Sequence, residues 1–526
     1  MEMATEISKP PLMPDQEILC ADAVVIGAGL GGLGAAGYLA RAGYNVVVLE
    51  HHIVPGGYAH EFKRRGFRFE VALHALDGAG PDGWLGPMLD DLGVNDRVVM
   101  NRVDPFYTAR FPDFEITAPA DFTGYVSELK AAFPDQSEGI DGLFDAVRRV
   151  AEDARRYGAD RSTGRRSSPI EMMERYPDMA AAFPQSWQTF MDAHIDDRRL
   201  RAAVSVLWGY LGLPPSQLSA GLFSLLLHSY HMTGAWYPEG GSQAMSRAIV
   251  DEIEERGGVV LFRNRVTRLD VEGGRVVAVE TDRGLRVEAD VFISNASPKA
   301  TVAMTGSEHF DDGFLAGVER DVPALSNLVV YLGVDRDLAA EGWDHHEYFL
   351  ADGYDIDGEY TAMVDGDFSK AGFVITNYSD ADPGCAPAGS SVLAIMSLAP
   401  WDYQNVWGTG GDLTDYSENP EYVRIKDAAG DELIDRAERL IPGLRESIVI
   451  KEVGTPLTNV RYSLSPEGSI YGRQQTVENL LNRRSPKTSI PNLLLAGAWV
   501  GGGGMSAALS SGRTAASIAD RLLTPG

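Results

Sequence analysis

The residues of this 526-residue chain that are best suited to chemistry begin with three glycines and an acid near the N-terminus. Gly27, Gly29 and Gly32 follow an apolar run as a GxGxxG turn, and a second apolar run, 46–49, ends directly before Glu50. Such a turn lets backbone approach a pyrophosphate, and an acid about 20 residues on accepts hydrogen bonds from a ribose hydroxyl. The flanking runs and the acid favour a dinucleotide site over the alternative, a glycine-rich surface turn.

The elements that must position this turn are a strand, a helix that opens at the glycines, and a second strand. Further segments of the same kind follow much later in the chain. A helix is predicted over 244–253, a strand over 490–496 runs into glycines at 501–504, and a last helix covers 507–523. The fold class is therefore α/β, with a Rossmann-type domain built from discontinuous segments. Short strands between these segments are predicted at 259–262, 266–271, 276–281 and 291–296.

Two long insertions separate the segments of this domain. We predict a disordered tail at 1–18 and assign 19–84, 238–297 and 486–526 to the nucleotide-binding domain. The insertions, 85–237 and 298–485, are expected to form one α+β substrate-binding or cap domain. Within the second insertion, alternating apolar residues predict strands at 326–334, 373–378 and 392–397, and a helix covers 431–440.

The overall composition of the chain limits the kinds of partner that the protein is expected to bind. The formal net charge is −29, and nucleic-acid binding needs a basic face, so no nucleic-acid partner is expected. Cys20 and Cys385 are the two cysteines, and they suggest neither a disulfide framework nor a metal site. The polar N-terminal tail lacks the features of a signal peptide, and the longest apolar stretch, 202–227, is broken by prolines. A cytoplasmic protein is expected.

Two further glycine segments connect the chain to a known family. They are Pro55-Gly56-Gly57 and Ala496-Gly497-Ala498. Their order after the first turn resembles the FAD-dependent amine oxidase and phytoene desaturase superfamily, over nearly the whole chain. The resemblance implies pyrophosphate contacts at the first turn, ribose at Glu50, adenine at Val266, and flavin or ribityl contacts near Gly57 and Gly497. With their neighbours, the residues so expected to bind FAD are Gly27, Gly29, Gly32, Glu50, His51, Gly56, Gly57, Val266, Gly497, Ala498 and Met505.

Four other segments narrow the resemblance to the branch that contains carotenoid cis-trans isomerase and retinol saturase. That branch usually has Asp where this chain has Glu70 and Gly where it has Ala72, and its C-terminal turn also differs. The resemblance implies an FAD-dependent oxidoreductase that isomerises, saturates or desaturates a C=C bond of a long apolar polyene or isoprenoid, such as a carotenoid or retinoid. The segments that carry the likeness are 57–62 with 69–74, 237–243, 455–462 and 468–472.

Such chemistry needs a proton donor as well as a hydride carrier. A flavin handles the hydride, whereas saturation or isomerisation of a polyene also needs an acid that can return its proton. Tyr471 is our first candidate, and the other candidates are Glu70, His74, His228, His231 and Glu467. The alternative for Tyr471 is an aromatic wall, and for Glu70 and His74 it is buried hydrogen bonding to loops. His228 and His231 share a helix face, for which we favour a structural role.

An apolar substrate also implies a tunnel and a surface through which the substrate arrives. Most aromatic residues of the insertions are expected in the core, with some along a tunnel. The run 222–227 is a candidate interfacial helix for peripheral membrane contact. The arginines within 148–166 either touch anionic headgroups or form a solvated face, and we favour the solvated face.

Two other functions on the same fold stay open. A flavin oxidase of amines or other small molecules would use a compact aromatic cage. A non-catalytic carrier of prenylated proteins, of the Rab escort type, would have lost the flavin, and Glu50, Gly57 and Gly497 argue against it. A second GxGxxG turn with its acid is absent, so no NAD(P)H domain is expected, and the electron donor or acceptor is not identified.

Overall fold

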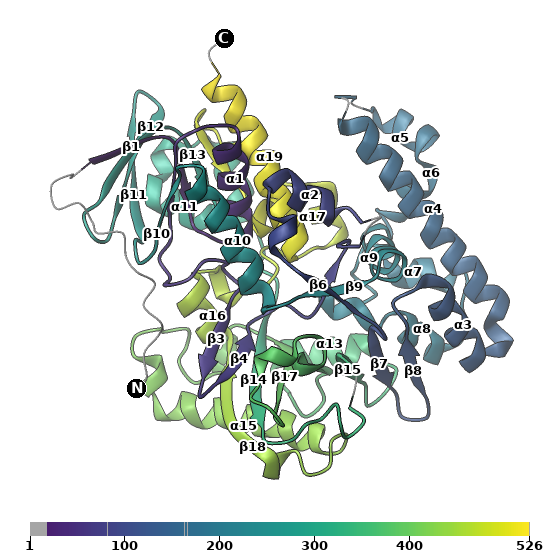
Figure 1. The fold of residues 1–526 in the computed structure, drawn as a ribbon. Coiled ribbons are helices and arrows are strands. Elements are labelled where there is room, and N and C mark those ends of the chain that lie inside the picture. Colours follow the sequence, from purple (N-terminus) through teal and green to yellow (C-terminus); the bar gives the residue numbers. More distant parts are fainter. Residues whose placement is uncertain (1–17, 81–82, 163, 166, 344, 525–526) are drawn as a thin grey trace.

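The computed structural model describes residues 18–524 apart from 81–82, 163, 166 and 344. The tail predicted at 1–18 lies almost wholly outside the described residues, and the first strand already begins at Ile18. Two large sheets and a layer of helices make up the molecule, and α1 (Leu30–Arg41) from the N-terminal part of the described chain lies beside the C-terminal helix α19 (Met505–Leu523) (Figure 1).

The first sheet is parallel at its centre and carries the glycine turn. Its strands run in the order β10-β2-β1-β13, and the second half of β13 continues onto β19. All of β2 and the last residues of β1 are buried, as expected for apolar strands covered on both faces. The bounds are β1 (Ile18–Ile26), β2 (Val46–Leu49), β10 (Val259–Leu261), β13 (Arg286–Ser294) and β19 (Leu493–Leu495).

Three helices cover one face of this sheet and bring the chain ends together. They are α1 (Leu30–Arg41), α10 (Gly241–Glu255) and α19 (Met505–Leu523). A Cβ on Gly512 would lie 2.2 Å from the Gly31 carbonyl oxygen, so α1 and α19 approach each other as closely as their backbones allow. The C-terminal helix therefore packs against the helix that follows the glycine turn.

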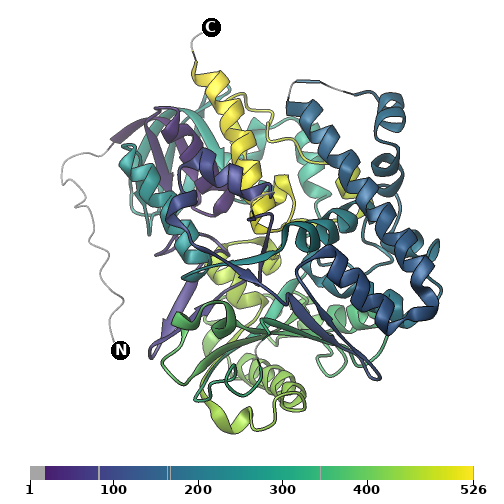
Figure 2. The ribbon, with the colours of Figure 1, turned by 45° about the vertical axis from the view of Figure 1, so that its right-hand side comes forward.

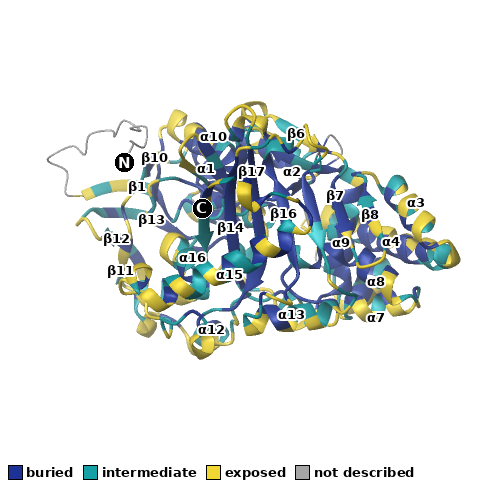
Figure 3. Cartoon of the chain, turned by 90° about the horizontal axis from the view of Figure 1, so that it is seen from below, coloured by how far each residue is buried: buried dark blue, intermediate teal, exposed yellow. Residues whose placement is uncertain are grey.

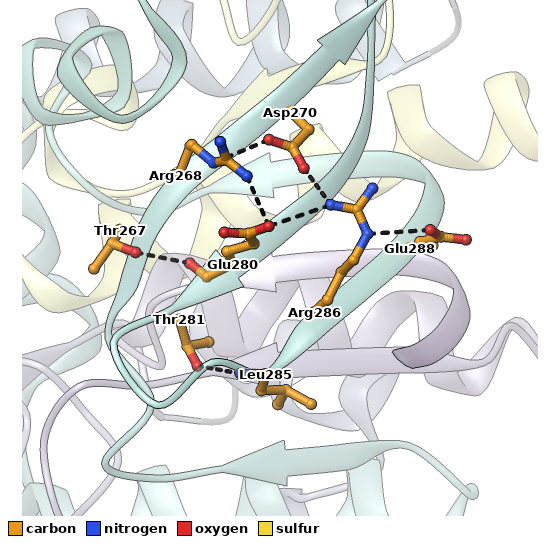
Figure 4. Close-up of polar contacts among 8 residues, drawn as sticks. All are labelled: Thr267, Arg268, Asp270, Glu280, Thr281, Leu285, Arg286 and Glu288. Carbon is orange, nitrogen blue, oxygen red and sulfur yellow. Dashed lines mark hydrogen bonds and ion pairs between the residues drawn. The ribbon is translucent and has the colours of Figure 1, made fainter. Parts of the chain in front are cut away.

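An antiparallel arm extends the first sheet through β11 (Val266–Glu272) and β12 (Arg275–Thr281). Figure 4 shows the Arg286 guanidinium between Asp270, Glu280 and Glu288 on its outer face. Arg268 binds Glu280 at 2.7 Å in the same network. Cross-strand pairs of this kind contribute roughly 0.2–1 kcal/mol each, and here they hold the strand that begins at Val266.

The two insertions share the second sheet. Its order is β18-β14-β17-β16-β15-β7-β8, and the parallel pair β15–β7 joins the second insertion to the first. Every residue of β14 is buried, and Figure 3 shows β14 and β17 as the buried centre of the molecule. The bounds are β7 (Tyr107–Arg110), β8 (Glu115–Ala118), β14 (Ser326–Val334), β15 (Glu347–Leu350), β16 (Phe373–Asn377), β17 (Ser391–Ala399) and β18 (Ile448–Gly454).

Two small sheets connect the large ones. The hairpin β3 (Glu61–Arg64) and β4 (Phe67–Glu70) follows the segment around Gly57, and β5 (Leu76–Asp77) pairs with β9 (Ala235–Pro238), which pairs with β6 (Met100–Val103). The chain between β4 and β5 runs beside the second sheet, where the Leu73 carbonyl accepts from the Tyr378 hydroxyl and His74 contacts Glu347 on β15. Asp77 follows as the last residue of β5.

A helical layer flanks the second sheet at the end formed by β8. Its longest helix, α4 (Ser137–Ser162), packs against α9 (Ala220–Thr233) and runs along the outside in Figure 2. None of residues 222–227 on α9 is exposed, so the stripe expected at a membrane surface is covered. No helix in the described part of the chain has the length and apolarity needed to span a bilayer.

The remaining helices pack around these units. Helix α15 (Pro420–Glu438) lies on β14, β17 and β18, and it begins eleven residues before the predicted helix because Asn419 caps it. The other α-helices are α2 (Leu85–Leu92), α3 (Phe122–Ala132), α5 (Pro169–Arg175), α6 (Pro177–Ala182), α7 (Trp187–Asp192), α8 (Arg198–Val204), α11 (Pro298–Thr305), α12 (Asp312–Glu319), α13 (Ile356–Asp365), α14 (Tyr378–Ala381), α16 (Pro456–Ser463), α17 (Val477–Leu481) and α18 (Ala498–Gly501).

Candidate active site

One cavity of about 1530 Å³ collects the predicted cofactor-binding residues from both ends of the chain. Single-ligand pockets are typically about 300–1,000 Å³, so this cavity has room for a cofactor and a long second molecule. Gly32 alone among the predicted set is absent from the lining. The predicted residues that line the cavity are Gly27, Gly29, Glu50, His51, Gly56, Gly57, Val266, Gly497, Ala498 and Met505.

Two glycines of the turn leave no room for a side chain. A Cβ on Gly32 would lie 2.0 Å from the Gly27 carbonyl oxygen, which explains a glycine that packs under the turn and does not face the cavity. A Cβ on Gly31 would lie 2.5 Å from the Gly497 amide nitrogen. Only glycine lets these backbones meet, and the resulting concave surface of free backbone fits a pyrophosphate.

Glu50 is a buried carboxylate held by backbone donors at the end of β2. The Ala28 amide donates to Oε2 at 2.6 Å and the His52 amide to Oε1 at 2.7 Å, while His51 Nδ1 lies 2.8 Å from Oε1. Burial opposes ionisation, but these donors outweigh it and lower the pKa of Glu50. His51 Nε2 is buried without a hydrogen-bond partner among the described residues. An anionic acceptor and an unpartnered ring nitrogen thus lie where the nucleotide ribose is expected.

Asn295 is a residue of this cradle that the sequence reasoning missed. It follows β13, donates its backbone amide to Ile26 at 2.8 Å, and lines the cavity. A Cβ on Gly29 would lie 2.6 Å from its Nδ2. One sequence feature could have identified Asn295 as a ligand-binding residue. It lies at the carboxyl end of a strand beside β1, and ligands bind at this end of the strands in open α/β sheets.

The C-terminal glycines lead into the start of α19. The Gly497 amide donates to Ser511 Oγ at 2.7 Å, and Gly502 and Gly504 have φ of 105° and 101°. Met505 and Ser506, the first residues of α19, line the cavity. The free amides of this helix start point a positive dipole end at the cavity, which suits the anionic part of a reduced flavin.

A histidine–glutamate pair lies on another part of the cavity wall. His74 lines the cavity, and its Nδ1 lies 2.7 Å from Oε1 of Glu347, which is fully buried on β15. Burial opposes ionisation of Glu347, but attraction and hydrogen bonding from His74, with help from His346 and Tyr210, outweigh it and lower the pKa of the carboxyl. His74 Nε2 has no hydrogen-bond partner within the described part of the chain. Glu347 therefore fixes the ring and leaves Nε2 for the cavity.

Tyr471, the first acid candidate, also lines the cavity. Its hydroxyl donates to the Gly209 carbonyl oxygen at 2.9 Å, and burial raises its pKa well above the ordinary value. The proton is thus held by backbone and resists ionisation. The geometry is compatible with two roles for Tyr471, as part of an aromatic wall and as a proton donor. Its catalytic role stays a prediction.

Glu70, by contrast, lies outside the cavity lining. Its carboxylate accepts from the Ser242 amide at 2.8 Å, from Ser242 Oγ at 2.7 Å and from the Leu73 amide at 3.3 Å. Burial raises the pKa of Glu70 in spite of these bonds. The geometry favours the alternative named for it, fixing the loop that leads to His74 and the start of α10, and catalysis by Glu70 stays a prediction that its position does not support.

Asp77 is an acid on the cavity wall that the sequence reasoning did not single out. It ends β5, and its carboxyl shares the wall with Ser229, Trp84 and Ser506. Burial raises the pKa of Asp77 against the opposing influence of these side chains, Ser229 first. Asp77 thus favours its neutral, proton-carrying form more than an ordinary aspartate. No sequence motif marks it, because its partners come from distant segments.

The two histidines of α9 lie in different environments despite their shared spacing. His231 is buried and stacks on Tyr125 with ring centroids 4.0 Å apart, which agrees with a structural role. His228 instead lines the cavity beside Leu225 and Leu226. No group of three potential metal ligands was found among the described residues.

Together, the α/β fold and the glycine cradle define a class of protein, an FAD-binding oxidoreductase. Residues 30–519 match the family described as flavin containing amine oxidoreductase, and the chain belongs to this family. The match confirms the predicted superfamily, α/β fold class and FAD cofactor. The protein is an FAD-dependent oxidoreductase.

Curated relatives carry names from polyene chemistry. The all-trans-retinol 13,14-reductase of Danio rerio is 26% identical, over 94% of this chain and 85% of the reductase. The prolycopene isomerase 2, chloroplastic, of an Oncidium hybrid cultivar is 28% identical, over 86% of this chain and 75% of the isomerase. Both are similar to this chain along most of its length.

Solved structures share the fold at lower identity. An oxidoreductase from Methanosarcina mazei superimposes with a TM-score of 0.64 and 20% identity, covering 94% of this chain and 99% of the other. Putrescine oxidase bound to putrescine gives 0.61 and 15%, covering 95% and 99%. These likenesses establish the architecture and leave the substrate to the site itself.

Proposed function

We propose that this flavoenzyme acts on a C=C bond of a long apolar polyene or isoprenoid, such as a carotenoid or retinoid, by isomerisation, saturation or desaturation. The observation that carries the proposal is the continuity of the cavity. It reaches from the glycine cradle to an apolar wall on α9 without interruption. The names of the curated relatives support the same substrate class.

The chain's own residues hold the substrate and exclude water. Tyr210 and Tyr230 line the cavity near His74, and burial raises the pKa of both far above the ordinary value, so neither ring adds charge. Leu222, Leu225 and Leu226 continue the wall along α9. An extended apolar chain is stabilised here by the area it removes from water, at about 25 cal/mol per Å².

The proton chemistry is proposed for His74. FAD, when bound, supplies hydride transfer. Because Glu347 holds His74 Nδ1, the neutral ring presents Nε2 to the cavity as a proton acceptor, and once Nε2 has accepted a proton from a polyene carbon or from solvent it can return that proton to a polyene carbon. Asp77 is a second proton source on the same wall. The helix start at Met505 favours negative charge at the neighbouring end of the cradle.

Of the alternatives, amine oxidation is supported by the family description and by the fold of putrescine oxidase. A small diamine needs a compact aromatic cage, whereas this cavity continues along leucines. A carrier without flavin is not supported either, because Glu50, Gly57 and Gly497 all line the cradle.

Membrane contact and a cytoplasmic location remain part of the proposal. Apolar substrates partition into membranes, so we expect peripheral contact during loading. Ile170 and Met173 on α5 are 67% and 62% exposed and suit this contact better than residues 222–227. Flotation with liposomes, compared with an Ile170→Asp variant, tests the contact.

The substrate class is tested by turnover with three compounds. FAD-loaded protein, oxidised or photoreduced without oxygen, is mixed with all-trans-retinol, with prolycopene and with putrescine. We expect a new polyene isomer or a reduced polyene, and no hydrogen peroxide with putrescine in air. Stoichiometric reoxidation of reduced flavin by a polyene indicates saturation, and isomer formation without reoxidation indicates isomerisation. Turnover of putrescine with no change in either polyene contradicts the proposal.

A further inference from the structure

The far end of the cavity opens between two helices. We call this opening the α4–α9 mouth, and its residues are Ala151, Glu152, Ala154, Arg155, Leu222, Leu225, Leu226 and His228. Its walls are largely apolar, and Arg155 is exposed at its edge. A long ligand that reaches the cradle would leave its other end at this mouth.

Arg155 differs from the other arginines of its helix and the loop that follows. Arg148 binds Asp145 and Glu152, Arg149 binds Asp178, and Arg156 binds Asp153. Arg165 pairs with Glu171, and Arg161 lies over the Tyr157 ring. The Arg155 side chain has no ion pair, hydrogen bond or ring contact with any described residue, and among the described arginines of this run it is the one that lines the cavity. Most of the run is therefore a solvated, paired surface, whereas Arg155 has a guanidinium that is free to bind a ligand.

The charges around Arg155 define what it can bind. Glu152 lies at the same mouth, and its carboxylate is 3.5 Å from Arg148. Burial lowers the pKa of His228, so the ring is neutral at neutral pH. The mouth thus offers one uncommitted positive charge beside a carboxylate that disfavours a highly charged ligand. A guanidinium pairs well with a planar, singly charged carboxylate.

We propose that the α4–α9 mouth binds the terminal carboxylate of an extended apolar substrate, with Arg155 as the specificity-determining residue. The substrate class is a long-chain isoprenoid or acyl acid, in place of a hydrocarbon or an alcohol. This inference rests on the proposed function, because it names the end group of the molecule that occupies the cavity. The apolar chain lies along α9, and the carboxylate remains at the exposed edge, where it stays partly hydrated.

The test measures binding rather than turnover, so it does not depend on the reaction. FAD-loaded wild type, Arg155→Gln, Arg155→Lys and Arg149→Gln are titrated with retinoic acid and retinol, and separately with palmitic acid and hexadecanol. Each pair differs in its end group. Arg149 is the matched control, since it lies on the same helix, carries the same charge and pairs with Asp178 away from the cavity.

We expect Arg155→Gln to weaken both acids about tenfold and to leave both alcohols unchanged, as expected for one charge-assisted hydrogen-bonded pair. Arg155→Lys should lose less affinity for the acids, and Arg149→Gln should lose none. If the variant binds acids and alcohols more weakly by the same factor, Arg155 contributes only packing contacts and the inference is overturned. It is also overturned if the acid affinities do not change, including the case in which the variant instead loses binding to phosphatidylserine vesicles.

Because the palmitic acid pair contains no polyene, its outcome separates the two proposals. Selective loss of palmitate binding supports the carboxylate site even if no polyene is turned over. Polyene turnover without any preference for acids preserves the proposed function and rejects the carboxylate site.

Discussion

The two parts of the cavity are built in opposite ways. The cradle consists of backbone around glycines, with Glu50 fixed by neighbouring amides. The wall near His74 consists of side chains, and its supporting carboxylate, Glu347, comes from a strand far away in the sequence. The cradle is therefore specified by short local motifs. The wall depends on how segments distant in the chain pack against each other.

The carboxyl groups of the two parts show the same contrast. Glu50 and Asp77 both line the cavity and are both disfavoured as anions by burial. At Glu50 the His51 side chain, together with two backbone donors, reverses the effect and lowers the pKa, whereas the side chains around Asp77 do not, and its pKa is raised. Two acids of one cavity with opposite shifts are suited to different tasks, here holding a sugar hydroxyl and carrying a proton.

The largest effect is expected from Gly32→Ala in the cradle. The new Cβ would overlap the Gly27 carbonyl, so the turn must open. The variant should purify without flavin, as measured by the ratio of flavin to protein absorbance. Gly158→Ala on α4 is the control, because a Cβ there meets nothing within 4 Å. It should retain FAD and gain up to about 1 kcal/mol of helix stability. A yellow Gly32→Ala protein would show that the turn is not the cradle.

The next largest effect is expected at the His74 wall. His74→Gln should lower kcat by about 10²–10⁴-fold while FAD content stays unchanged, because proton transfer is lost and the cradle is not touched. Glu347→Gln should lower kcat less and shift the pH–rate profile, since Glu347 acts through His74. Tyr471→Phe serves as the comparison. If it abolishes turnover and His74→Gln does not, the proton comes from Tyr471.

A smaller loss is expected for Glu50→Gln. The amide keeps one oxygen acceptor but turns its NH₂ toward a backbone donor, either Ala28 or His52. Hydrogen bonds to charged groups contribute about 1.5–3 kcal/mol, so the Kd for FAD should rise about 10- to 100-fold. Titration of the deflavinated protein with FAD measures this change. An unchanged Kd would remove Glu50 from the site.

The smallest effect is expected from the protonation of His231, which is buried against Tyr125. Burial lowers the pKa of His231 to about 4, so the folded state binds its proton less readily than the unfolded state. Its contribution to stability is present above pH 6.5, the ordinary value, and is lost as the pH falls toward 4. The loss between pH 7 and pH 5 is about 2 kcal/mol. His231→Phe keeps the stacking on Tyr125 and should reduce the drop in Tm over this range. An equal drop in both proteins would contradict the assignment.

Local signals made much of the fold predictable. The predicted strand at 326–334 is β14, with the same bounds, because its apolar residues carry a strand pattern that can be read locally. The α/β class followed from the glycine turn between two apolar runs, and the FAD cofactor followed from the family resemblance that the further glycine segments carry. The pairing of β7 with β15 was not predictable, because it joins two insertions whose sequences carry no sign of each other.

The same division applies to the site. By itself, the sequence determined the cradle, because a tight turn, a close backbone approach and an acid after a strand are properties of a few consecutive residues. Only the tertiary structure decided which acids face the cavity: it placed Glu70 under a loop, brought Glu347 to His74 and set Asp77 on the cavity wall. It also distinguished Arg155 from its paired neighbours. The physical reason is that burial and charge pairing depend on segments distant in the chain, and no local pattern encodes them.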